Sequence, residues 1–426
     1  MKTSHTRLYR MIPIILIVFI LINNASGEST RQNCDRNNDF PSDSLNTVLL
    51  ARQQEKRNTT QTRKRKCQYN QKNNGENQWK RGLRPRSRKR RVEALIEKSA
   101  GDEGLQFNGG ATSVLQGSLG EKQYYSTATA SFDIYAQATL AENTIFFIDL
   151  EAVGGNGPDE YFPNTAGMNG DAGSTQNEDG TDRLTVLEVW TEMKMLNQRV
   201  AVTTGKIDMT NYFDINDVAN DETTQFISGA FINSSAFAMP ENSPGIRVHI
   251  CATETIYLQM GLASADNSGD RIFSELYKIA GIGCMLLPES NFVAKIKMYG
   301  YQHPLADNAT GWGLNIDQQL FENYRLFARY GKNSLQMTRY WGIRSAWSAG
   351  LNIRSNLLGR TFVSGIAYGV NHSTETEPTS EQLLELYGRH QLNQKISLSM
   401  HLQHLWNESS NESETLIFGI RTHFNF

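Results

Sequence analysis

From residue 108 onward, hydrophobic and polar residues alternate along the chain in sixteen stretches of eight to fifteen residues. Alternation with a period of two is typical of β-strands that separate two environments, because successive side chains point to opposite faces. The stretches span 108–118, 126–140, 144–153, 184–196, 199–208, 245–252, 255–264, 278–287, 291–301, 310–320, 323–332, 341–354, 361–371, 381–392, 396–406 and 415–426. The pattern therefore predicts an all-β fold with an even number of strands.

The connections between these stretches differ in length in a regular way. Very short ones, such as 141–143 and 197–198, alternate with generally longer ones, such as 154–183 and 209–244. Outer-membrane barrels of bacteria combine short periplasmic turns with longer external loops. We therefore predict a sixteen-stranded antiparallel transmembrane β-barrel over residues 105–426, with the two longest loops as the best candidates to fold inward.

The final stretch shows the two faces that such a barrel needs. One face carries Leu416, Phe418, Ile420, Thr422, Phe424 and Phe426, and the other carries Thr415, Ile417, Gly419, Arg421, His423 and Asn425. In 341–354, Trp341, Ile343 and Trp347 are expected on the apolar face. The apolar faces would meet lipid, and the polar faces would line a water-filled lumen, which a barrel of this size can enclose.

The overall composition agrees with this prediction and excludes one alternative. A mean hydropathy of −0.48 is too low for a polytopic helical membrane protein, which needs repeated apolar runs of about 20 residues. The net charge of −2 hides a split, because residues 1–100 sum to +14 and residues 101–426 to −16. The two parts therefore need separate interpretations.

The first 27 residues have the features of a secretory signal peptide. Lys2, Arg7 and Arg10 precede an apolar run at 11–22, and small residues follow, including Ala25 and Gly27. Export by this signal peptide would take the barrel to the outer membrane of a Gram-negative cell.

Residues 28–104 form a basic, low-complexity tail. Few of its residues are apolar, so it is expected to be disordered. Basic clusters at 63–66 and 86–91 would ordinarily suggest nucleic acid, but export argues against that partner. Peptidoglycan or lipopolysaccharide is the more plausible partner, and a simple solvated tail is the alternative.

Residues 126–245 resemble the carbohydrate-selective porin family of Gram-negative outer membranes, the OprB type. The resemblance is carried by 131–135 (SFDIY), 146–160 (FFIDLEAVGGNGPDE), 169–174 (NGDAGS), 182–188 (DRLTVLE), 205–208 (GKID) and 210–226 (TNYFDINDVANDETTQF). It implies a sixteen-stranded barrel through which mono- or oligosaccharides diffuse passively, without a cofactor. The basic tail does not fit the core pattern of this family.

Charged residues of the predicted lumen are sorted along the chain. Residues 149–222 contain fifteen acids and four bases, whereas 323–360 contain seven bases and no acid. The expected pore-lining residues are Asp149, Glu151, Glu188, Glu192, Lys206 and Asp208 on early strands, and Arg325, Arg329, Arg344 and Arg354 on later ones. Strands so far apart in sequence lie on opposite walls of a closed barrel. We therefore predict a transverse electric field, which favours dipolar solutes such as sugars.

Four aromatic residues of the two long loops complete the set of candidates for sugar binding. They are Tyr161, Phe162, Tyr212 and Phe213, and packing within the loops is the alternative role for each.

Other functions receive less support from the sequence. His390, His401, His404 and His423 lie near Ser397 and Ser399, but the chain has no Gly-x-Ser-x-Gly motif, and the barrel region has no HExxH or CxxC motif. The acidic loop 171–182 lacks the spacing of an EF-hand. We therefore expect no enzyme activity and no metal site. A barrel that anchors the cell wall and a general ion-permeable porin remain as alternatives, as does a homotrimer.

Overall fold

The computed structural model of the protein describes residues 105–119, 124–162, 164–165, 167–172, 182–265, 275–288, 290, 292–373, 380–407 and 414–426. The predicted signal peptide and basic tail, with Cys34 and Cys67, lie outside the described residues.

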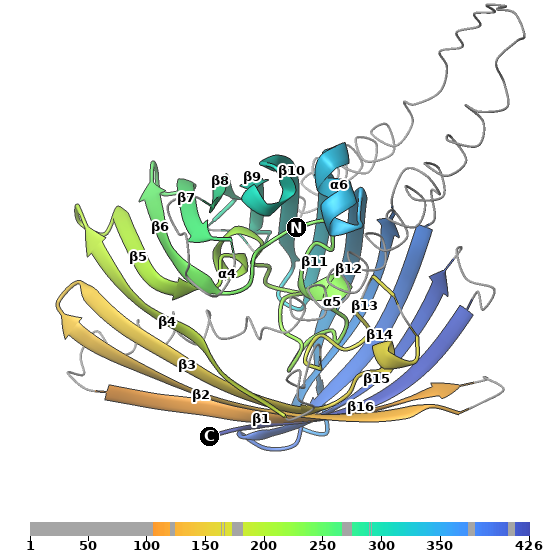
Figure 1. Cartoon of the computed structure of the whole chain (residues 1–426). Helices are drawn as coiled ribbons and strands as arrows, with labels where there is room; N and C mark the ends of the chain where they lie inside the picture. The colour runs from red at the N-terminus through yellow and green to blue at the C-terminus, as the bar shows by residue number, and fades with distance from the viewer. Residues whose placement is uncertain are drawn as a thin grey trace, which may run out of the picture. The chain divides into compact units, whose positions relative to one another are not determined.

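Sixteen strands in the described ranges form one closed antiparallel barrel (Figure 1). They are β1 (Leu105–Leu119), β2 (Ser126–Ala141), β3 (Thr144–Gly155), β4 (Arg183–Met195), β5 (Val200–Ile207), β6 (Ser243–Cys251), β7 (Ile256–Ser264), β8 (Leu276–Leu286), β9 (Ala294–His303), β10 (Ala309–Leu320), β11 (Tyr324–Asn333), β12 (Ser345–Leu357), β13 (Arg360–His372), β14 (Ser380–Gln391), β15 (Ile396–Asn407) and β16 (Glu414–Asn425). Each strand pairs with its neighbour in sequence, and β1 pairs with β16 to close the ring. The predicted fold class and strand number are therefore confirmed.

The side chains alternate between the two faces of the barrel wall as predicted. On β1, Leu115 is 56% exposed on the outer face, whereas its neighbour Val114 is only 1% exposed. Aromatic pairs occupy the outer face near the long-connection ends, including Trp312 with Tyr330 and Trp347 with Tyr368. Such aromatic girdles are typical of barrels at the membrane–water interface.

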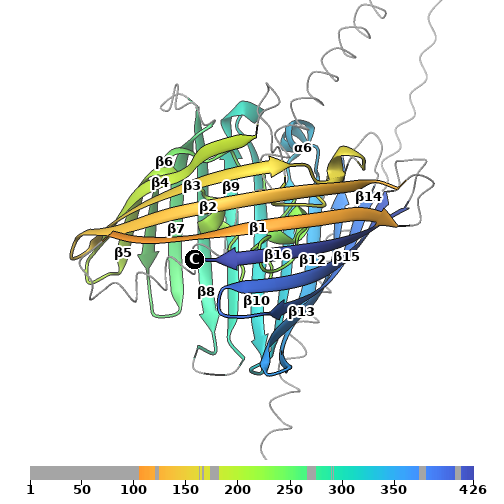
Figure 2. The same ribbon diagram turned by 90° about the horizontal axis from the view of Figure 1, so that it is seen from below.

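The strands are strongly inclined. In Figure 2, β1–β4 cross the view at a large angle to the strands of the opposite wall. Closure of a sheet into a barrel requires this tilt, because the strands must be staggered to keep their hydrogen bonds around the ring.

One predicted strand is wrong at its beginning. Residues Leu335–Trp341 form the helix α6, and β12 begins only at Ser345. The side chain of Ser334 accepts the Met337 N–H at the start of α6, and Gly342 (φ 85°) ends it in the left-handed conformation that favours glycine. Trp341 is therefore buried inside the barrel instead of facing lipid. None of the helices in the described ranges is long and apolar enough to span a membrane.

Candidate functional site

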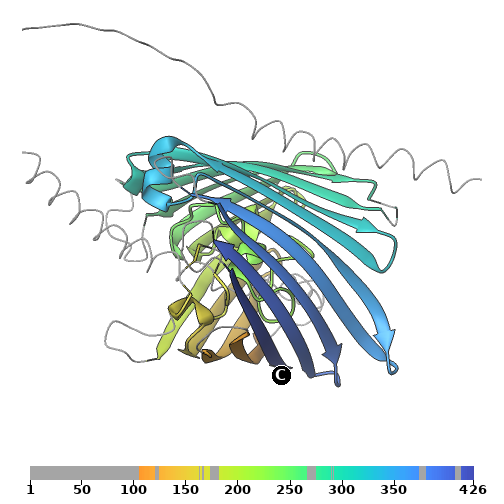
Figure 3. The ribbon, with the colours of Figure 1, turned by 90° about the vertical axis from the view of Figure 1, so that its right-hand side faces the viewer.

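A long connection folds into the barrel and packs against the inner side of its wall. We call residues 208–242, between β5 and β6, the inner segment. It contains two short helices, α4 (Thr210–Phe213) and α5 (Gly229–Ile232). Figures 1 and 3 show it inside the ring of strands, and its Phe213, Phe226 and Phe231 have no exposed surface.

Apolar packing holds the inner segment against two parts of the wall. Phe237 lies 4.4 Å from the ring of Tyr299 and 5.3 Å from that of Tyr301, both on β9. Phe226 packs at 4.9 Å against Tyr387 on β14. A lumen is expected to be polar. The aromatic residues at these inward positions are therefore best explained as a packing surface for the inner segment.

A buried arginine fixes the centre of the inner segment. Arg329 on β11 donates from Nε to Asp214 Oδ1 (3.2 Å) and from Nη1 to the Phe231 carbonyl (2.7 Å). Its Nη2 donates to the carbonyls of Asp214 (3.1 Å) and Ala219 (2.6 Å). Arg329 therefore serves as an anchor for the inner segment instead of presenting its charge to open water.

A second arginine repeats this arrangement on β16. Arg421 donates to the Glu222 carbonyl and to the Gln225 carbonyl (2.9 Å), and its Nε donates to Ser399 Oγ (3.1 Å). It is 1% exposed. Carbonyl oxygens of the turn at 222–225 are thus satisfied by a charged donor from the wall.

Glu385 on β14 holds the next part of the inner segment. It accepts the backbone N–H groups of Ile227 (2.8 Å) and Ser228 (3.0 Å). Its Oε1 also lies 2.9 Å from His401 Nδ1, and His401 Nε2 lies 2.9 Å from Ser399 Oγ. This order of groups resembles a hydrolase triad. However, Ser399 and His401 are each only 2% exposed, and the Ser399 hydroxyl already accepts a hydrogen bond from Arg421 Nε. The arrangement therefore supports the inner segment.

A second internal element follows β3. The described residues of 156–172, here called the upper segment, contain the 3₁₀ turn η1 (Pro158–Glu160). Asp159 accepts the backbone N–H groups of Met168 (2.5 Å) and Asn169 (3.2 Å) and the Asn164 amide (2.8 Å). Burial raises the pKa of Asp159 to about 6, although these hydrogen bonds act in the opposite direction.

The upper and inner segments contact each other. The Gly170 N–H donates to the Ile227 carbonyl, and the Gly229 N–H donates to the Gly167 carbonyl, both at 2.8 Å. The inner segment and the described residues of the upper segment therefore contact each other inside the ring of strands, as expected of the two longest loops.

The predicted acids of the early strands lie on one wall. Asp149 stands opposite Glu188, and Glu151 forms an ion pair with Arg183 (2.9 Å). Glu188 accepts the Asn211 amide (2.9 Å) at the start of the inner segment, where Asp208 also lies. Asp149, Glu151, Glu188 and Asp208 are all buried.

Glu192 belongs to the same wall, closer to the short turn after β4. It accepts the Thr203 hydroxyl at 2.9 Å and lies 3.5 Å from Arg247. The guanidinium of Arg247 in turn stacks over the ring of Tyr212 at 4.0 Å. Glu192 is therefore linked to the inner segment through Arg247.

Lys206 differs from the expectation that it lines the lumen. It pairs with Val189, so its side chain lies on the outer face of the wall, and its Nζ donates to the Val186 carbonyl at 2.7 Å. The physical reason is that β5 ends at Ile207, and its inward positions are Ala201, Thr203 and Ile207. Asp208 follows the strand, so alternation does not relate it to Lys206.

The remaining predicted arginines lie on β11 and around β12. Arg325, whose side chain is 38% exposed, lies 3.5 Å from Asp217 of the inner segment. Arg344 lies just before β12, where its N–H donates to the His372 carbonyl (2.9 Å), and Arg354 is exposed near the short turn after β12. Their role in solute selection stays a prediction.

The four aromatic candidates are placed differently from one another. Tyr161 is 47% exposed and stacks on Tyr125 at 4.7 Å. Phe162, Tyr212 and Phe213 are buried in apolar clusters. Of these four candidates, Tyr161 is the one whose ring is extensively exposed.

Sequence reasoning did not single out Asp214, Glu385 or Arg421. Alternation correctly placed Arg421 on the polar face of its strand. However, nothing local to the sequence shows that Arg421 or Glu385 would meet the inner segment, which is 150 or more residues away for both.

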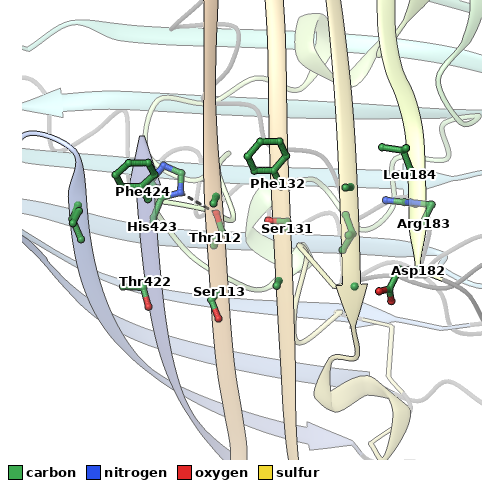
Figure 4. Close-up of a pocket in the computed structure, with 16 residues that line it drawn as sticks. Thr112, Ser113, Ser131, Phe132, Asp182, Arg183, Leu184, Thr422, His423 and Phe424 are labelled. Atoms are coloured by element: carbon green, nitrogen blue, oxygen red, sulfur yellow. Dashed lines mark hydrogen bonds between the residues drawn. The ribbon is translucent and has the colours of Figure 1, made fainter. Parts of the chain in front are cut away.

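A separate hollow lies on the outer face of the barrel and is not part of the lumen. It has a volume of about 750 Å³, and its outward residues include Ala111, Ala130 and Ala152. Figure 4 shows Phe132, Phe424 and Leu184 around it, with the hydrogen bond between His423 and Thr112 (2.9 Å) formed by lumen-facing residues of the same wall. Small side chains flanked by large ones produce this shape.

Within the described ranges, no group of three or more His, Cys, Asp or Glu side chains is arranged to hold a metal ion. Cys251 on β6 and Cys284 on β8 are free thiols.

Comparisons with known proteins agree with the barrel architecture. The carbohydrate-selective porin family, OprB, matches residues 127–271. The high-pH structure of OprB from Pseudomonas putida is similar with a TM-score of 0.62 and 12% identity, covering 78% of this chain and 97% of that chain. The low-pH structure of the same protein matches with a TM-score of 0.52 and 13% identity, covering 78% and 96%.

A comparison of sequences covers more of the chain than the family match does. An uncharacterised protein of Aquifex aeolicus (strain VF5) is 25% identical over 252 residues, which are 59% of this chain and 72% of that protein. The family match lies within a closed sixteen-stranded barrel of the same fold as OprB. Over residues 127–271 the chain is therefore similar to the OprB family of carbohydrate-selective porins, and its sixteen-stranded barrel has the fold of a porin.

Proposed function

We propose that sugars diffuse passively through the lumen of this barrel, past the inner and upper segments. The observation that carries this proposal is the way the inner segment is fixed inside the lumen. Arg329, Arg421 and Glu385 together hold it at residues 214–231 with charged hydrogen bonds. A fixed internal segment narrows the lumen permanently, so solutes would be selected by size and polarity without a gating step.

The charged walls supply the polarity. Acids on β3 and β4 face β11 and β12 across the ring, because the strand order places these pairs on opposite sides. On the basic wall, Arg329 is used by the inner segment, so Arg325 is the better candidate for contact with solutes. The proposed transverse field therefore runs between the acidic wall and Arg325, with Asp217 modulating its strength.

Liposome swelling with the full-length mature protein tests this function. Vesicles carrying the barrel are expected to swell in iso-osmotic glucose and more slowly in oligosaccharides, whereas empty vesicles do not swell. Equal permeability to salts and sugars would instead favour a general ion-permeable porin. No swelling, with peptidoglycan binding intact, would favour a barrel that anchors the cell wall.

Further proposals concern the parts outside the described residues. Residues 1–27 would act as a cleaved signal peptide, and the basic tail at 28–104 would bind peptidoglycan or lipopolysaccharide through its clustered Lys and Arg side chains. Mass spectrometry of the mature N-terminus tests the cleavage. Binding of peptidoglycan by the full mature protein, compared with a variant lacking 28–104, tests the tail.

The homotrimer is a separate proposal. General porins are often trimers, and a homotrimer would place three pores side by side in the membrane. The mass of the purified complex in detergent, corrected for bound detergent, distinguishes one copy from three.

A further inference from the structure

A polar hollow remains between the inner segment and the wall formed by β14–β16. Its volume is about 380 Å³, and residues 215–225 form one side of it. The opposite side includes Gln391, Gln394, Ser397 and Asn425. Gln394 lies in the short turn between β14 and β15, and Asn425 is the last residue of β16. The hollow is therefore at the short-turn end of the lumen, which faces the periplasm in barrels of this class.

The hollow is lined by charged groups of both signs, some of which have nearby partners. Asp217 pairs with Lys295 (2.8 Å) and Arg325 (3.5 Å). Asp221 accepts the backbone N–H (3.0 Å) and hydroxyl (2.6 Å) of Thr223. Arg389 contributes a positive charge to the same lining. The lining thus carries charges of both signs, so it does not favour a solute of one sign.

Amide groups, in contrast, remain available for hydrogen bonds. Asn220 is only 3% exposed, and its Oδ1 accepts the Asn216 N–H (3.0 Å), but its amide nitrogen donates to no group among the described residues. Gln394 is exposed, and its side chain forms no hydrogen bond within the described part of the chain. Asn425 Oδ1 forms a hydrogen bond with His423 Nε2 (3.0 Å), and the amide nitrogen of Asn425 can still donate to a ligand. These groups match the hydroxyl groups of a neutral polyol.

We propose that this hollow is a binding station for one uncharged sugar ring, reached after the solute has passed the inner segment. The inference rests on the proposed function, because only a sugar-conducting lumen would deliver the ligand. A volume of 380 Å³ is near the lower end of the roughly 300–1,000 Å³ of small-molecule pockets, so it suits a monosaccharide better than an oligosaccharide. The hollow has no Phe, Tyr or Trp in its lining, so binding is weak enough for release into the periplasm.

Single-channel recording of the full-length mature protein with glucose as the probe tests this station. In Asn220→Ala with Gln394→Ala, the glucose residence time derived from current noise is expected to fall about fivefold, as the loss of one or two hydrogen bonds predicts. The conductance without sugar should stay unchanged, which also shows that the variant is folded. Asn356→Ala is the matched control, because Asn356 is an exposed amide at the same end of the barrel that does not line the hollow.

The outcomes separate the inference from the proposed function. Wild-type residence times in the double variant, or an equal loss in Asn356→Ala, would overturn the station while leaving sugar conduction intact. Stronger block by glucose 6-phosphate than by glucose would overturn the preference for an uncharged ligand. If wild-type channels showed neither glucose block nor liposome swelling, the proposed function itself would be wrong.

Discussion

Arg329 donates to four oxygen atoms of the inner segment with a single guanidinium group. Replacing it with methionine would leave the Asp214 carboxylate buried without this cation. We expect Arg329→Met to lower the free energy of unfolding by about 3–5 kcal/mol, the usual cost of breaking a buried ion pair. Urea denaturation in detergent measures this loss. Arg354→Met, at an exposed position, is the control with the same change of residue and should cost little.

An alternative outcome would contradict this role of Arg329. If Arg329→Met and Arg354→Met unfolded at the same urea concentration, the hydrogen bonds of Arg329 would contribute nothing to the anchoring of the inner segment.

Asp159 provides a prediction about pH at the same scale. Burial raises the pKa of Asp159 from its ordinary value of 3.8 to about 6, so the folded protein holds this proton more tightly than the unfolded chain does. The stabilisation is present below about pH 4 and is lost as the pH rises through 6, and it amounts to at most about 3 kcal/mol. Hydrogen exchange at 167–172 is therefore expected to be less protected at pH 8 than at pH 5, after correction for intrinsic rates.

Asp159→Asn is the control for this pH effect. It keeps a side-chain acceptor for the Met168 N–H but cannot titrate. The difference between pH 5 and pH 8 should disappear in this variant. A difference that persisted in Asp159→Asn would assign the pH dependence to another group.

At the scale of elements, two glutamates of β14 act on different internal segments. Glu385 accepts the N–H groups of Ile227 and Ser228 in the inner segment, whereas Glu381 accepts the N–H (2.8 Å) and hydroxyl (2.7 Å) of Thr165 in the upper segment. Glu385→Ala should therefore raise hydrogen exchange at 227–228, and Glu381→Ala should raise it at 165. We expect increases of roughly tenfold, because each lost charged hydrogen bond contributes about 1.5 kcal/mol or more.

The two variants serve as controls for each other. Because both remove a carboxylate from the same strand, a general weakening of β14 would increase exchange at both segments alike. That result would contradict the assignment of one glutamate to each segment.

The sequence predicted the strands better than the connections, for a physical reason. Lipid outside and water inside impose alternation on every strand, so the pattern is local and repeats sixteen times. Trp341 and Ile343 also alternate, yet they lie in and just after α6, where Trp341 Nε1 donates to the Ser235 carbonyl (2.7 Å). An apolar residue that packs on the inner segment has the same local pattern as one that faces lipid. Lys206 was misplaced because alternation cannot show where a strand ends.

The candidate site depends even more on contacts between distant residues. Arg329 was predicted to line the pore, but in the structure it anchors the inner segment. This role depends on Asp214, which lies 115 residues earlier. Charge counting could identify an acidic wall and a basic wall, but not the internal segment placed between them. The structure therefore changes which arginine is expected to contact solutes.

At the scale of the whole molecule, the opposed charges of the two walls should determine ion selectivity. Arg325 is a partly exposed cation of the basic wall, and it adjoins Asp217 near the short-turn end. Removing a unit charge at roughly 8 Å from the ion path in water changes the interaction energy by about 0.5 kcal/mol, which corresponds to a factor of about two. Arg325→Ala is therefore expected to raise the cation-to-anion permeability ratio about twofold.

Reversal potentials across planar bilayers with a salt gradient measure this ratio. Arg344→Ala, which removes another predicted charge of this wall, should change the ratio in the same direction. Arg360→Ala is the matched control, because Arg360 lies on the outer face next to the short turn between β12 and β13 and cannot act on the lumen directly. The effect should also shrink at high salt, because screening shortens the range of the field. Both Arg325→Ala and Arg344→Ala could instead keep the wild-type permeability ratio and the wild-type sugar block. In that case the two walls would not act as opposed charges. Selection would then depend on the shape of the inner segment alone.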